Sequence, residues 1–389
     1  MNKKIPYGRQ CITDDDIKAV INTLQSDFLT QGPQVPEFES AFAKYVGSEY
    51  AVAVSNGTAA LHLAALALNV SANDNVIVPP ITFAASANCI RYCGGNVTFC
   101  DIDKDNYLID LEKLEDLLQS KPKGYYKGIV PVDYTGYPVD GEKLKKIADN
   151  YALWIIEDAC HAPGAYFIDS KEEKQKTGNG KFAELTCFSF HPVKHITTGE
   201  GGMITTNSKE LYEKLLLLRT HGITKDSDKL KENHGGWYYE MQDLGYNYRL
   251  TDFQAALGIS QLKRADININ KRIEIANNYN NAFNNIQEII TPKVNDNVRH
   301  AYHLYVIQTD KRLELYNYLK QKGIFTQVHY IPVHLMPYYQ AQGCKKGDFI
   351  NSEIFYDHCL SLPMYPTLTI MEQHYVIQEI QIFFNSKTI

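Results

Sequence analysis

The sequence predicts an α/β fold, in which a mostly parallel central sheet has helices on both faces and a smaller C-terminal α+β domain follows. Short apolar runs alternate with amphipathic stretches between residues 50 and 155, a pattern typical of parallel strands joined by helical crossovers. From about residue 295 onward, strand-like and helical stretches are mixed. We therefore expect a large domain over residues 1–262, and a connecting helix with a small domain over residues 263–389.

Composition limits the classes of protein that need to be considered. The chain has 389 residues, of which 44% are hydrophobic and 22% charged, and its net charge is −6. This charge argues against general nucleic-acid binding, which needs a basic face. No apolar run is long enough to span a membrane, and the stretch MNKKIPYGRQ lacks the apolar segment of a signal peptide. We expect a cytoplasmic protein that binds neither nucleic acid nor membrane.

Neither the cysteines nor the histidines form a metal-binding pattern. Cys89, Cys93 and Cys100 lie near one another in the sequence, but no paired CxxC accompanies them. His329 and His334 lack an evident third ligand. We expect buried free thiols, ordinary loop histidines and no metal.

The N-terminal segment predicts two helices joined by a loop. Thr13 precedes three aspartates, and a hydroxyl cap with acidic neighbours favours a helix that runs to about Ser26. A second amphipathic helix follows over residues 38–45. The loop between them carries Phe28 and Leu29, which either pack within the loop or form a wall near a pocket.

A short strand over residues 50–54 runs directly into Ser55-Asn56-Gly57-Thr58-Ala59, where a helix begins. Small residues at such a turn let backbone N–H groups converge on an anion at the positive end of the helix dipole. The pattern fits an ordinary capped turn equally well. On this motif alone, a phosphate cup and a plain turn both stay open.

The alternation of strands and helices then continues. We predict strands over residues 76–78, 97–100, 128–132 and 152–156, and helices beginning at Thr82, Asp110 and Asp140. Parallel sheets bind ligands at the carboxyl ends of their strands. The residues that follow each strand are therefore the first candidates for chemistry.

Asp158 comes just after the strand over residues 152–156. A carboxylate at that position is costly to bury unless it has a partner. It either caps a following helix or faces a cationic ring nitrogen in a pocket.

Residues 183–206 contain the most informative motif of the chain. A strand pattern ends near Ser189, and a break at Pro192 leads to a single lysine, Lys194, before a Gly-rich turn and a second strand. A lysine on a tight connection between two buried strands is placed as a nucleophile would be. The alternative is a solvated surface lysine, which is the usual environment of this residue type.

The rest of the chain predicts further helices and a polar loop. We expect a helix over residues 208–219, a surface loop over residues 225–240, a helix from near Thr251 past Leu262, and a long connecting helix to about residue 285. In the small domain we expect strands over residues 303–308 and 324–331 and helices near Asn351 and Ile370.

Five features at the ends of the predicted strands complement one another. The Gly57–Ala59 turn can hold a phosphate, and Ser189 can add a hydroxyl to it. Asp158 can pair with a protonated ring nitrogen, Lys194 can form a Schiff base, and Phe83 can stack on a flat ring. Together these are the requirements of pyridoxal 5′-phosphate, whose ring acts as an electron sink when its nitrogen is protonated.

With these motifs, nearly the whole chain resembles the DegT/DnrJ/StrS sugar aminotransferases, which have the type I aspartate aminotransferase fold. The resemblance implies a pyridoxal-phosphate-dependent transfer of an amino group. It rests on these stretches: Thr30-Gln31-Gly32, Ser55 to Leu61, Thr82-Phe83-Ala84-Ala85, Glu157 to Ala162, Phe188 to Lys194, Gly199-Glu200-Gly201-Gly202, Arg219-Thr220-His221-Gly222 and Asn247-Tyr248-Arg249-Leu250.

Three stretches resemble the branch of this family that acts in pseudaminic acid biosynthesis, namely residues 189–198, 327–330 and 361–363. That branch aminates C4 of a UDP-linked 4-keto-6-deoxy-N-acetylhexosamine of the L-altro series. The resemblance implies L-glutamate as the amino donor and 2-oxoglutarate as its product. Other keto sugars, UDP- or dTDP-linked and aminated at C3 or C4, stay open.

The resemblance also implies roles for single residues. Lys194 bonds to the cofactor, Asp158 faces the pyridinium nitrogen and His161 lies near the phenolic oxygen of the ring. Thr58 and Ala59 offer backbone N–H groups to the phosphate, and Ser189 offers its hydroxyl. Asn247 reaches the phosphate of the partner subunit, which implies an obligate homodimer. The substrate-facing positions are Tyr7, Phe28, Leu29, Thr30, Arg249, His329 and Tyr330.

Two other functions are compatible with parts of this pattern. Related dehydratases carry a histidine where this chain has Lys194, so the lysine argues against dehydration. A non-catalytic regulator could share the fold, but the set of Asp158, Ser189 and Lys194 argues for an enzyme.

Overall fold

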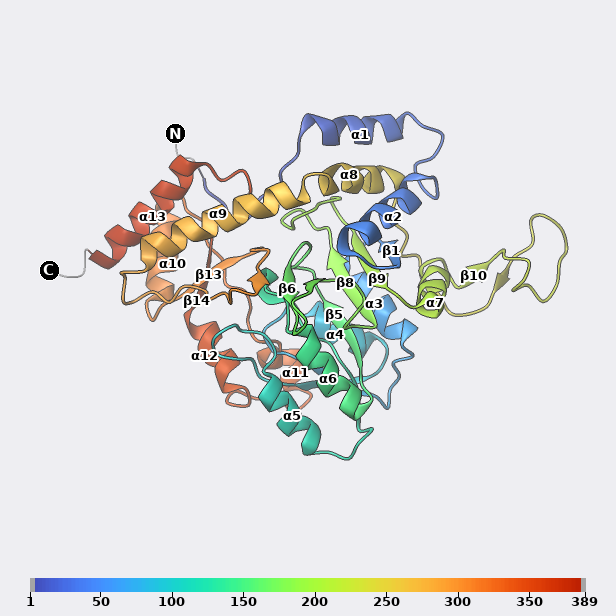
Figure 1. The fold of residues 1–389 in the computed structure, drawn as a ribbon, viewed down its shortest axis with the longest axis horizontal. Helices are drawn as coiled ribbons and strands as arrows, with labels where there is room; N and C mark the ends of the chain where they lie inside the picture. Colours follow the sequence, from blue (N-terminus) through green and yellow to red (C-terminus); the bar gives the residue numbers. More distant parts are fainter. Residues whose placement is uncertain (1–3, 386–389) are drawn as a thin grey trace.

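A sheet of seven strands forms the centre of the molecule in this computed structural model (Figure 1), which describes residues 4–385. Residues 1–3, part of the stretch considered as a signal peptide, lie outside the described residues. The strand order is β1 (Tyr50–Val54), β9 (Gly202–Thr206), β8 (Leu185–Ser189), β5 (Trp154–Asp158), β4 (Tyr126–Ile129), β2 (Asn75–Val78) and β3 (Asn96–Phe99). Strand β9 is antiparallel to both of its neighbours, and the other pairs are parallel. The predicted mostly parallel sheet is thus confirmed.

Alternation along the strands separates two cores, one on each face of the sheet. On β1, Val52 and Val54 join the cluster formed with α3 (Gly57–Ala67), α4 (Ala85–Tyr92) and α7 (Lys209–Arg219). Ala51 and Ala53 join the opposite cluster, formed with α2 (Gln34–Val46) and α8 (Asp252–Leu262). Successive strand residues point to opposite faces, so the small and β-branched residues of this strand pack two different helix layers.

The other half of the sheet repeats this arrangement. Ile77, Ile129 and Ile155 pack with α5 (Leu111–Gln119) and α6 (Gly141–Tyr151). All three side chains are buried. Helices therefore cover both faces of the sheet, as the sequence predicts.

Helix starts follow the capping residues of the sequence. Thr13 forms a capping box with Asp16 at the start of α1 (Asp14–Leu24). Asp110 and Asp140 accept hydrogen bonds from the first turns of α5 and α6, and Ser208 does so for α7. Each cap satisfies backbone N–H groups that have no partner within the helix.

One helix prediction needs correction, since the helix expected from Thr82 is α4 and begins at Ala85. The helix expected from near Thr251 past Leu262 is α8, which ends at Leu262, and the expected connecting helix is α9 (Ala265–Phe283).

The C-terminal part surrounds a second, two-stranded antiparallel sheet of β13 (Tyr305–Gln308) and β14 (Cys359–Leu362). Its core includes residues from α9, α10 (Arg312–Gln321) and α13 (Ile370–Asn385). Helices α11 (Pro337–Gln340) and α12 (Ile350–His358) come between α10 and α13 in the order of the chain. The strand expected over residues 324–331 is wrong, since this segment pairs only through isolated bridges, Ile5 to Ile324 and Gln327 to Ser361.

Two smaller features lie beside the main sheet. Strands β6 (Tyr166–Ile168) and β7 (Lys174–Lys176) pair in a small sheet with β12 (Val298–Arg299). Strands β10 (Ile223–Thr224) and β11 (Glu240–Met241) carry a loop that projects from the body of the molecule (Figure 1). In the described chain, no helix is long and apolar enough to cross a membrane. The division at residue 262 stays a prediction.

Candidate active site

Four of the residues predicted to hold the cofactor lie along one edge of the sheet, because all strands except β9 run in the same direction. Gly57 follows β1, Asp158 ends β5 and Ser189 ends β8, while Phe83 follows β2. This edge is formed by the carboxyl ends of the parallel strands, where ligands of such sheets bind.

Lys194 lies on the connection between β8 and β9, and its ammonium group turns inward. Its Nζ atom is 3.4 Å from Nε2 of His303. Burial lowers the pKa of the Lys194 side chain, while nearby Cys160 and Asp158 oppose this effect. The alternative of a solvated surface lysine is therefore wrong.

Asp158 is 5% exposed and is held by two hydrogen bonds. The hydroxyl of Ser86 donates to its Oδ2 at 2.5 Å, and the backbone N–H of Cys160 donates to its Oδ1 at 3.1 Å. Thr82 Oγ1 lies 2.6 Å from Ser86 Oγ and extends the network. No helix begins after β5, so Asp158 is not a helix cap.

The N-terminus of α3 packs tightly against the end of β8. Asn56 caps the helix by accepting a hydrogen bond from the Ala59 backbone N–H at 2.8 Å. The Ala59 N–H, expected to serve a phosphate, is thus already paired, whereas Gly57 and Thr58 occupy the first helical positions, whose N–H groups have no acceptor within the helix. A Cβ on Gly57 would lie 2.9 Å from Ser189 Cβ.

His161 is buried and its tautomer is set by its neighbours. The backbone N–H of Thr135 donates to Nδ1 at 3.2 Å, so this nitrogen is not protonated. The other nitrogen, Nε2, lies 3.1 Å from the hydroxyl of Tyr330. Burial, and then the charge of Lys194, lower the pKa of His161 well below its usual range, so the ring is neutral and carries its proton on Nε2.

The turn that carries Thr135 is strained. Thr135 has φ of 60°, a conformation that β-branched residues rarely adopt. Its hydroxyl donates to the Tyr134 carbonyl at 2.6 Å and lies 3.1 Å from Nε2 of His300. The strain places one backbone N–H against His161, in keeping with the observation that strained residues concentrate at functional sites.

Aromatic side chains form the outer part of the site. Phe83 is 61% exposed, and its ring centroid lies 6.2 Å from that of Tyr330. Tyr7 lies 5.2 Å from His329 by the same measure. The Nδ1 atom of His329 lies 2.8 Å from the Ser361 hydroxyl. The structure therefore brings these four predicted residues into one group with His161.

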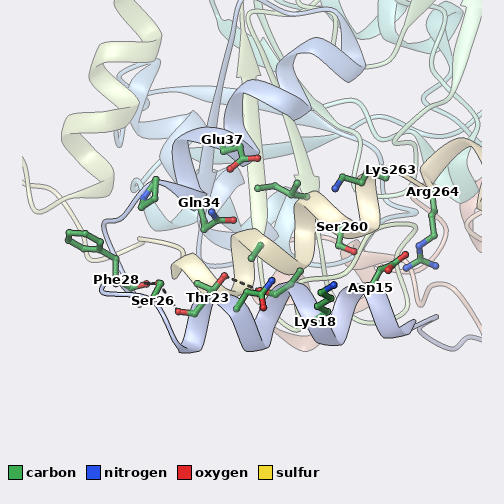
Figure 2. Close-up of a pocket in the computed structure, with 15 residues that line it drawn as sticks. Asp15, Lys18, Thr23, Ser26, Phe28, Gln34, Glu37, Ser260, Lys263 and Arg264 are labelled. Atoms are coloured by element: carbon green, nitrogen blue, oxygen red, sulfur yellow. Dashed lines mark hydrogen bonds between the residues drawn. The ribbon is translucent and has the colours of Figure 1, made fainter.

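The loop over residues 28–30 lies apart from this group. Its backbone is fixed by α8, since Asp252 donates its N–H to the Leu29 carbonyl at 2.9 Å. Phe28 is 53% exposed and lines a groove of about 600 Å³ between α1, α2 and α8 (Figure 2). Within residues 4–385, no hydrogen bond or ring contact joins Phe28, Leu29 or Thr30 to the residues around Lys194.

Asn247 and Arg249 lie on the segment that follows the projecting loop. Asn247 is exposed and Arg249 is half-buried, and Asn247 pairs with Thr220 through an isolated bridge. In the described part of the chain, the Arg249 guanidinium forms no ion pair.

Sequence reasoning missed several residues of the site. Ser86 and Thr135 are small hydroxyl residues within runs that read as ordinary helix and turn. His303 belongs to a His-Ala-Tyr-His stretch whose two histidines were a usable signal. Contacts across 72 or 109 positions, such as Ser86 to Asp158 and Lys194 to His303, leave no local pattern in the sequence.

Comparison with known proteins assigns the class. The DegT/DnrJ/EryC1/StrS aminotransferase family matches residues 10–381, and the chain belongs to this family. The residues of this site fit pyridoxal phosphate, because a helix N-terminus with backbone N–H groups that lack an acceptor within the helix, a buried carboxylate and an inward lysine share one edge of the sheet. The protein is a pyridoxal-phosphate-dependent sugar aminotransferase.

Three curated relatives cover almost the entire chain. The uncharacterized protein MJ1066 of Methanocaldococcus jannaschii is 43% identical, covering 94% of each chain. The spore coat polysaccharide biosynthesis protein SpsC of Bacillus subtilis is 40% identical, covering 98% of this chain and 97% of its own. A UDP-4-amino-4,6-dideoxy-N-acetyl-beta-L-altrosamine transaminase of Campylobacter jejuni is 38% identical, covering 96% and 95%.

Two solved structures have the same fold. The sugar aminotransferase Spr1654 of Streptococcus pneumoniae, in its PMP form, superposes with a TM-score of 0.90 at 28% identity over 98% of this chain and 99% of its own. PseC of Helicobacter pylori, an aminotransferase involved in the biosynthesis of pseudoaminic acid, has a TM-score of 0.87 at 32% identity over 99% and 100%. The predicted fold class is confirmed.

Proposed function

We propose that the protein transfers an amino group from L-glutamate to C4 of a UDP-linked 4-keto-6-deoxy-N-acetylhexosamine, giving UDP-4-amino-4,6-dideoxy-N-acetyl-β-L-altrosamine. The observation that supports amino-group transfer is the inward position of Lys194 near Asp158 and the α3 N-terminus. The choice of sugar is supported by the Campylobacter and Helicobacter relatives, which match nearly the whole chain.

In this proposal Lys194 moves the proton. Pyridoxal phosphate, when bound, supplies a carbonyl carbon that exchanges amino groups and a ring that accepts electrons. The Lys194 amine would take the proton from Cα of the amino donor and release it to the cofactor carbon that accepts the amino group; it would then run this transfer in reverse, delivering a proton to C4 of the sugar. Burial lowers the pKa of Lys194, which increases the fraction of free amine that can act as a base near neutral pH.

The other residues of the site would hold and orient the cofactor. Asp158, fixed by Ser86, would keep a ring nitrogen protonated. Gly57 and Thr58 would direct backbone N–H groups at the phosphate, and Ser189 would add its hydroxyl. The Nε2 proton of His161 would face the phenolic oxygen of the ring.

The sugar nucleotide would lie against the aromatic group. We assign Tyr7, His329 and Tyr330 to the sugar, with Arg249 as the basic partner of the diphosphate. The loop over residues 28–30 would close the substrate side. Asn247 would serve the phosphate site of the partner subunit in a homodimer.

A second candidate substrate is favoured by one observation. SpsC of Bacillus subtilis, a spore coat polysaccharide biosynthesis protein, is as similar to this chain as the altrosamine transaminase is. Another nucleotide keto sugar, UDP- or dTDP-linked and aminated at C3 or C4, would use the same lysine and carboxylate. A cytoplasmic location stays a prediction.

The role of Lys194 is tested by borohydride reduction of the holoprotein followed by peptide mass spectrometry. We expect the reduced cofactor on the peptide that carries Lys194, and no label in Lys194→Ala. Lys181→Ala, which removes a lysine paired with Asp169 on the surface, is the matched control and should be labelled like the wild type. Label on a different lysine contradicts the assignment.

The substrate is tested by glutamate-dependent amination of a panel of UDP- and dTDP-linked keto sugars. We expect turnover of the UDP-linked 4-keto sugar, with the amine found at C4 by NMR. Turnover of a dTDP-linked 3-keto sugar alone would contradict the proposal and favour the second candidate.

A further inference from the structure

Lys194 has an unusual partner for a buried ammonium group. No carboxylate in the described chain lies within ion-pair distance of its Nζ atom, and the hydrogen-bond partner found there is Nε2 of His303, at 3.4 Å. Asp158 influences Lys194 only through its charge. The amine is thus held by an imidazole ring and not by an acid.

The backbone that carries the His303 ring is held from two sides. The His303 carbonyl accepts a hydrogen bond from Arg272 Nη1 at 3.3 Å. The neighbouring Leu304 N–H donates to the Thr135 carbonyl at 3.2 Å. A Cβ on Gly136 would lie 3.1 Å from the His303 backbone nitrogen. The position of the His303 backbone therefore depends on α9 and on the turn after β4.

While Lys194 is an ammonium, the His303 ring accepts its hydrogen bond. His303 is 4% exposed, and its ring is tilted against that of His161, with ring centroids 4.3 Å apart, and that of His195, at 5.7 Å. Burial, and then the charge of Lys194, lower the pKa of His303 well below its usual range, so the ring is neutral. An ammonium only donates, so Nε2 supplies the lone pair and Nδ1 carries the proton. Nδ1 is buried and has no acceptor in the described chain.

We propose that His303 is a positioning residue of the transamination, which holds the Lys194 amine whenever this amine is not bonded to the cofactor. The inference rests on the proposed role of Lys194. A released lysine side chain has many rotamers, and a fixed acceptor within reach keeps Nζ near the atoms between which it moves a proton. A neutral acceptor does so without the strong stabilisation of the ammonium form that a carboxylate would give.

The test measures the pH midpoint of Lys194 in the full-length apoprotein. Wild type and variants are modified with trinitrobenzenesulfonate at a series of pH values, and the rate at Lys194 is followed by peptide mass spectrometry. The midpoint of the rate reports the protonation of the amine, while the limiting rate at high pH reports access, so the two effects separate.

We expect His303→Leu to lower this midpoint by about one pH unit, because the ammonium form loses its acceptor, and to raise the rate below the midpoint about tenfold. His303→Gln keeps an oxygen acceptor and should stay near the wild type. His195→Leu is the matched control, since the His195 ring is equally buried but bonds to the Ala301 carbonyl. Should His303→Leu not fold, His303→Met replaces it.

An unchanged midpoint in His303→Leu, or an equal shift in His195→Leu, overturns the proposal. Borohydride reduction of the same variants separates this failure from that of the function. If the label is on Lys194 throughout and the midpoints coincide, only the role of His303 is lost. If the label is on another lysine, the proposed role of Lys194 is lost whatever the midpoints are.

Discussion

Gly57 is the residue at which the first helix of the site comes closest to the sheet. Its missing side chain lets the α3 N-terminus approach the end of β8, where a Cβ would lie 2.9 Å from Ser189 Cβ and 3.2 Å from its hydroxyl. Its φ is not in the left-handed region. Space, and not backbone conformation, therefore requires glycine at this position.

For Gly57→Ala we expect a loss of about 1–3 kcal/mol in folding free energy, because the added methyl group must push α3 from Ser189. A displaced phosphate cup should also weaken cofactor binding at least about tenfold, the equivalent of 1.4 kcal/mol. Denaturant unfolding and absorbance titration of the apoprotein with pyridoxal phosphate measure these effects. Gly236→Ala, where an added Cβ meets nothing within 4 Å, is the control, and equal affinities would contradict the prediction.

At the residue scale, the sequence allows the reacting groups to be predicted better than their supports. Lys194 and Asp158 follow strands, and their chemistry is visible in the residue type. Ser86 fixes Asp158 from a helix 72 positions away, and such a contact depends on the packing of α4 against the sheet. The backbone N–H of Ala59 likewise donates to the Asn56 side chain, so this N–H, which the sequence motif suggests for the phosphate, is already paired.

Helix α9 joins the small sheet to the site through one buried arginine. Nη1 of Arg272 donates to the carbonyls of Tyr302 at 3.2 Å, His303 at 3.3 Å and Met364 at 2.9 Å. Burial lowers the pKa of Arg272 to about 10. Two chain segments, at residues 302–303 and at Met364, are therefore joined to α9 by a single guanidinium group.

For Arg272→Met we expect a loss of roughly 2–4 kcal/mol in folding free energy, because buried carbonyls lose their donor while the cost of burying a charge is relieved in part. The neighbouring Lys271 is exposed, so Lys271→Met should change stability by less than about 0.5 kcal/mol. Urea unfolding followed by circular dichroism measures both. If the two variants had the same unfolding midpoint, the hydrogen bonds of Arg272 would not stabilise the fold as we expect.

At the element scale, local signals predict helix starts better than isolated strand pairings. The caps at Thr13, Asp110, Asp140 and Ser208 each act within one turn of a helix, and each is readable from the sequence. Residues 324–331 have a strand-like pattern, but they find partners only at isolated positions.

The molecule as a whole buries neutral histidines. Burial lowers the pKa of His300 and of His329 to about 3, and lowers the pKa of His161, His195 and His303 well below their usual range. These groups remain neutral in the folded state at a pH where the unfolded chain protonates them, near 6.5. Stability from them is present above about pH 6.5 and is lost as the pH falls.

We therefore expect the free energy of unfolding to fall by several kcal/mol between pH 6 and 5, since each of these five histidines contributes up to about 1.4 kcal/mol per unit. Buried Asp133 and Glu157, whose pKa values are raised, oppose part of this effect. Urea unfolding at several pH values measures the slope. His300→Asn should reduce it and exposed His374→Asn should not; a flat profile contradicts the prediction.

If two subunits contribute residues to each active site, mixtures of inactive variants should recover activity. If Asn247 serves the neighbouring site, then mixing Lys194→Ala with Asn247→Ala subunits restores one complete site in each mixed dimer, or roughly a quarter of wild-type activity for random pairing. Each variant alone should be inactive or nearly so. Activity measured after unfolding and refolding the two together tests this, and no recovery would place Asn247 in its own subunit's site.

The pairing of β1 with β9 also sets the order in which the protein can mature during synthesis. In the described chain β1 pairs with β9 and with no other strand, Tyr50 facing Thr206. At 5–20 residues per second, a ribosome needs roughly ten to thirty seconds to reach β9 after completing β1. Until then the first strand has no partner and the edge of β8 is open. A truncated chain that ends before residue 206 therefore exposes strand edges that proteases and chaperones recognise, so quality control can detect an incomplete protein before its cofactor could bind.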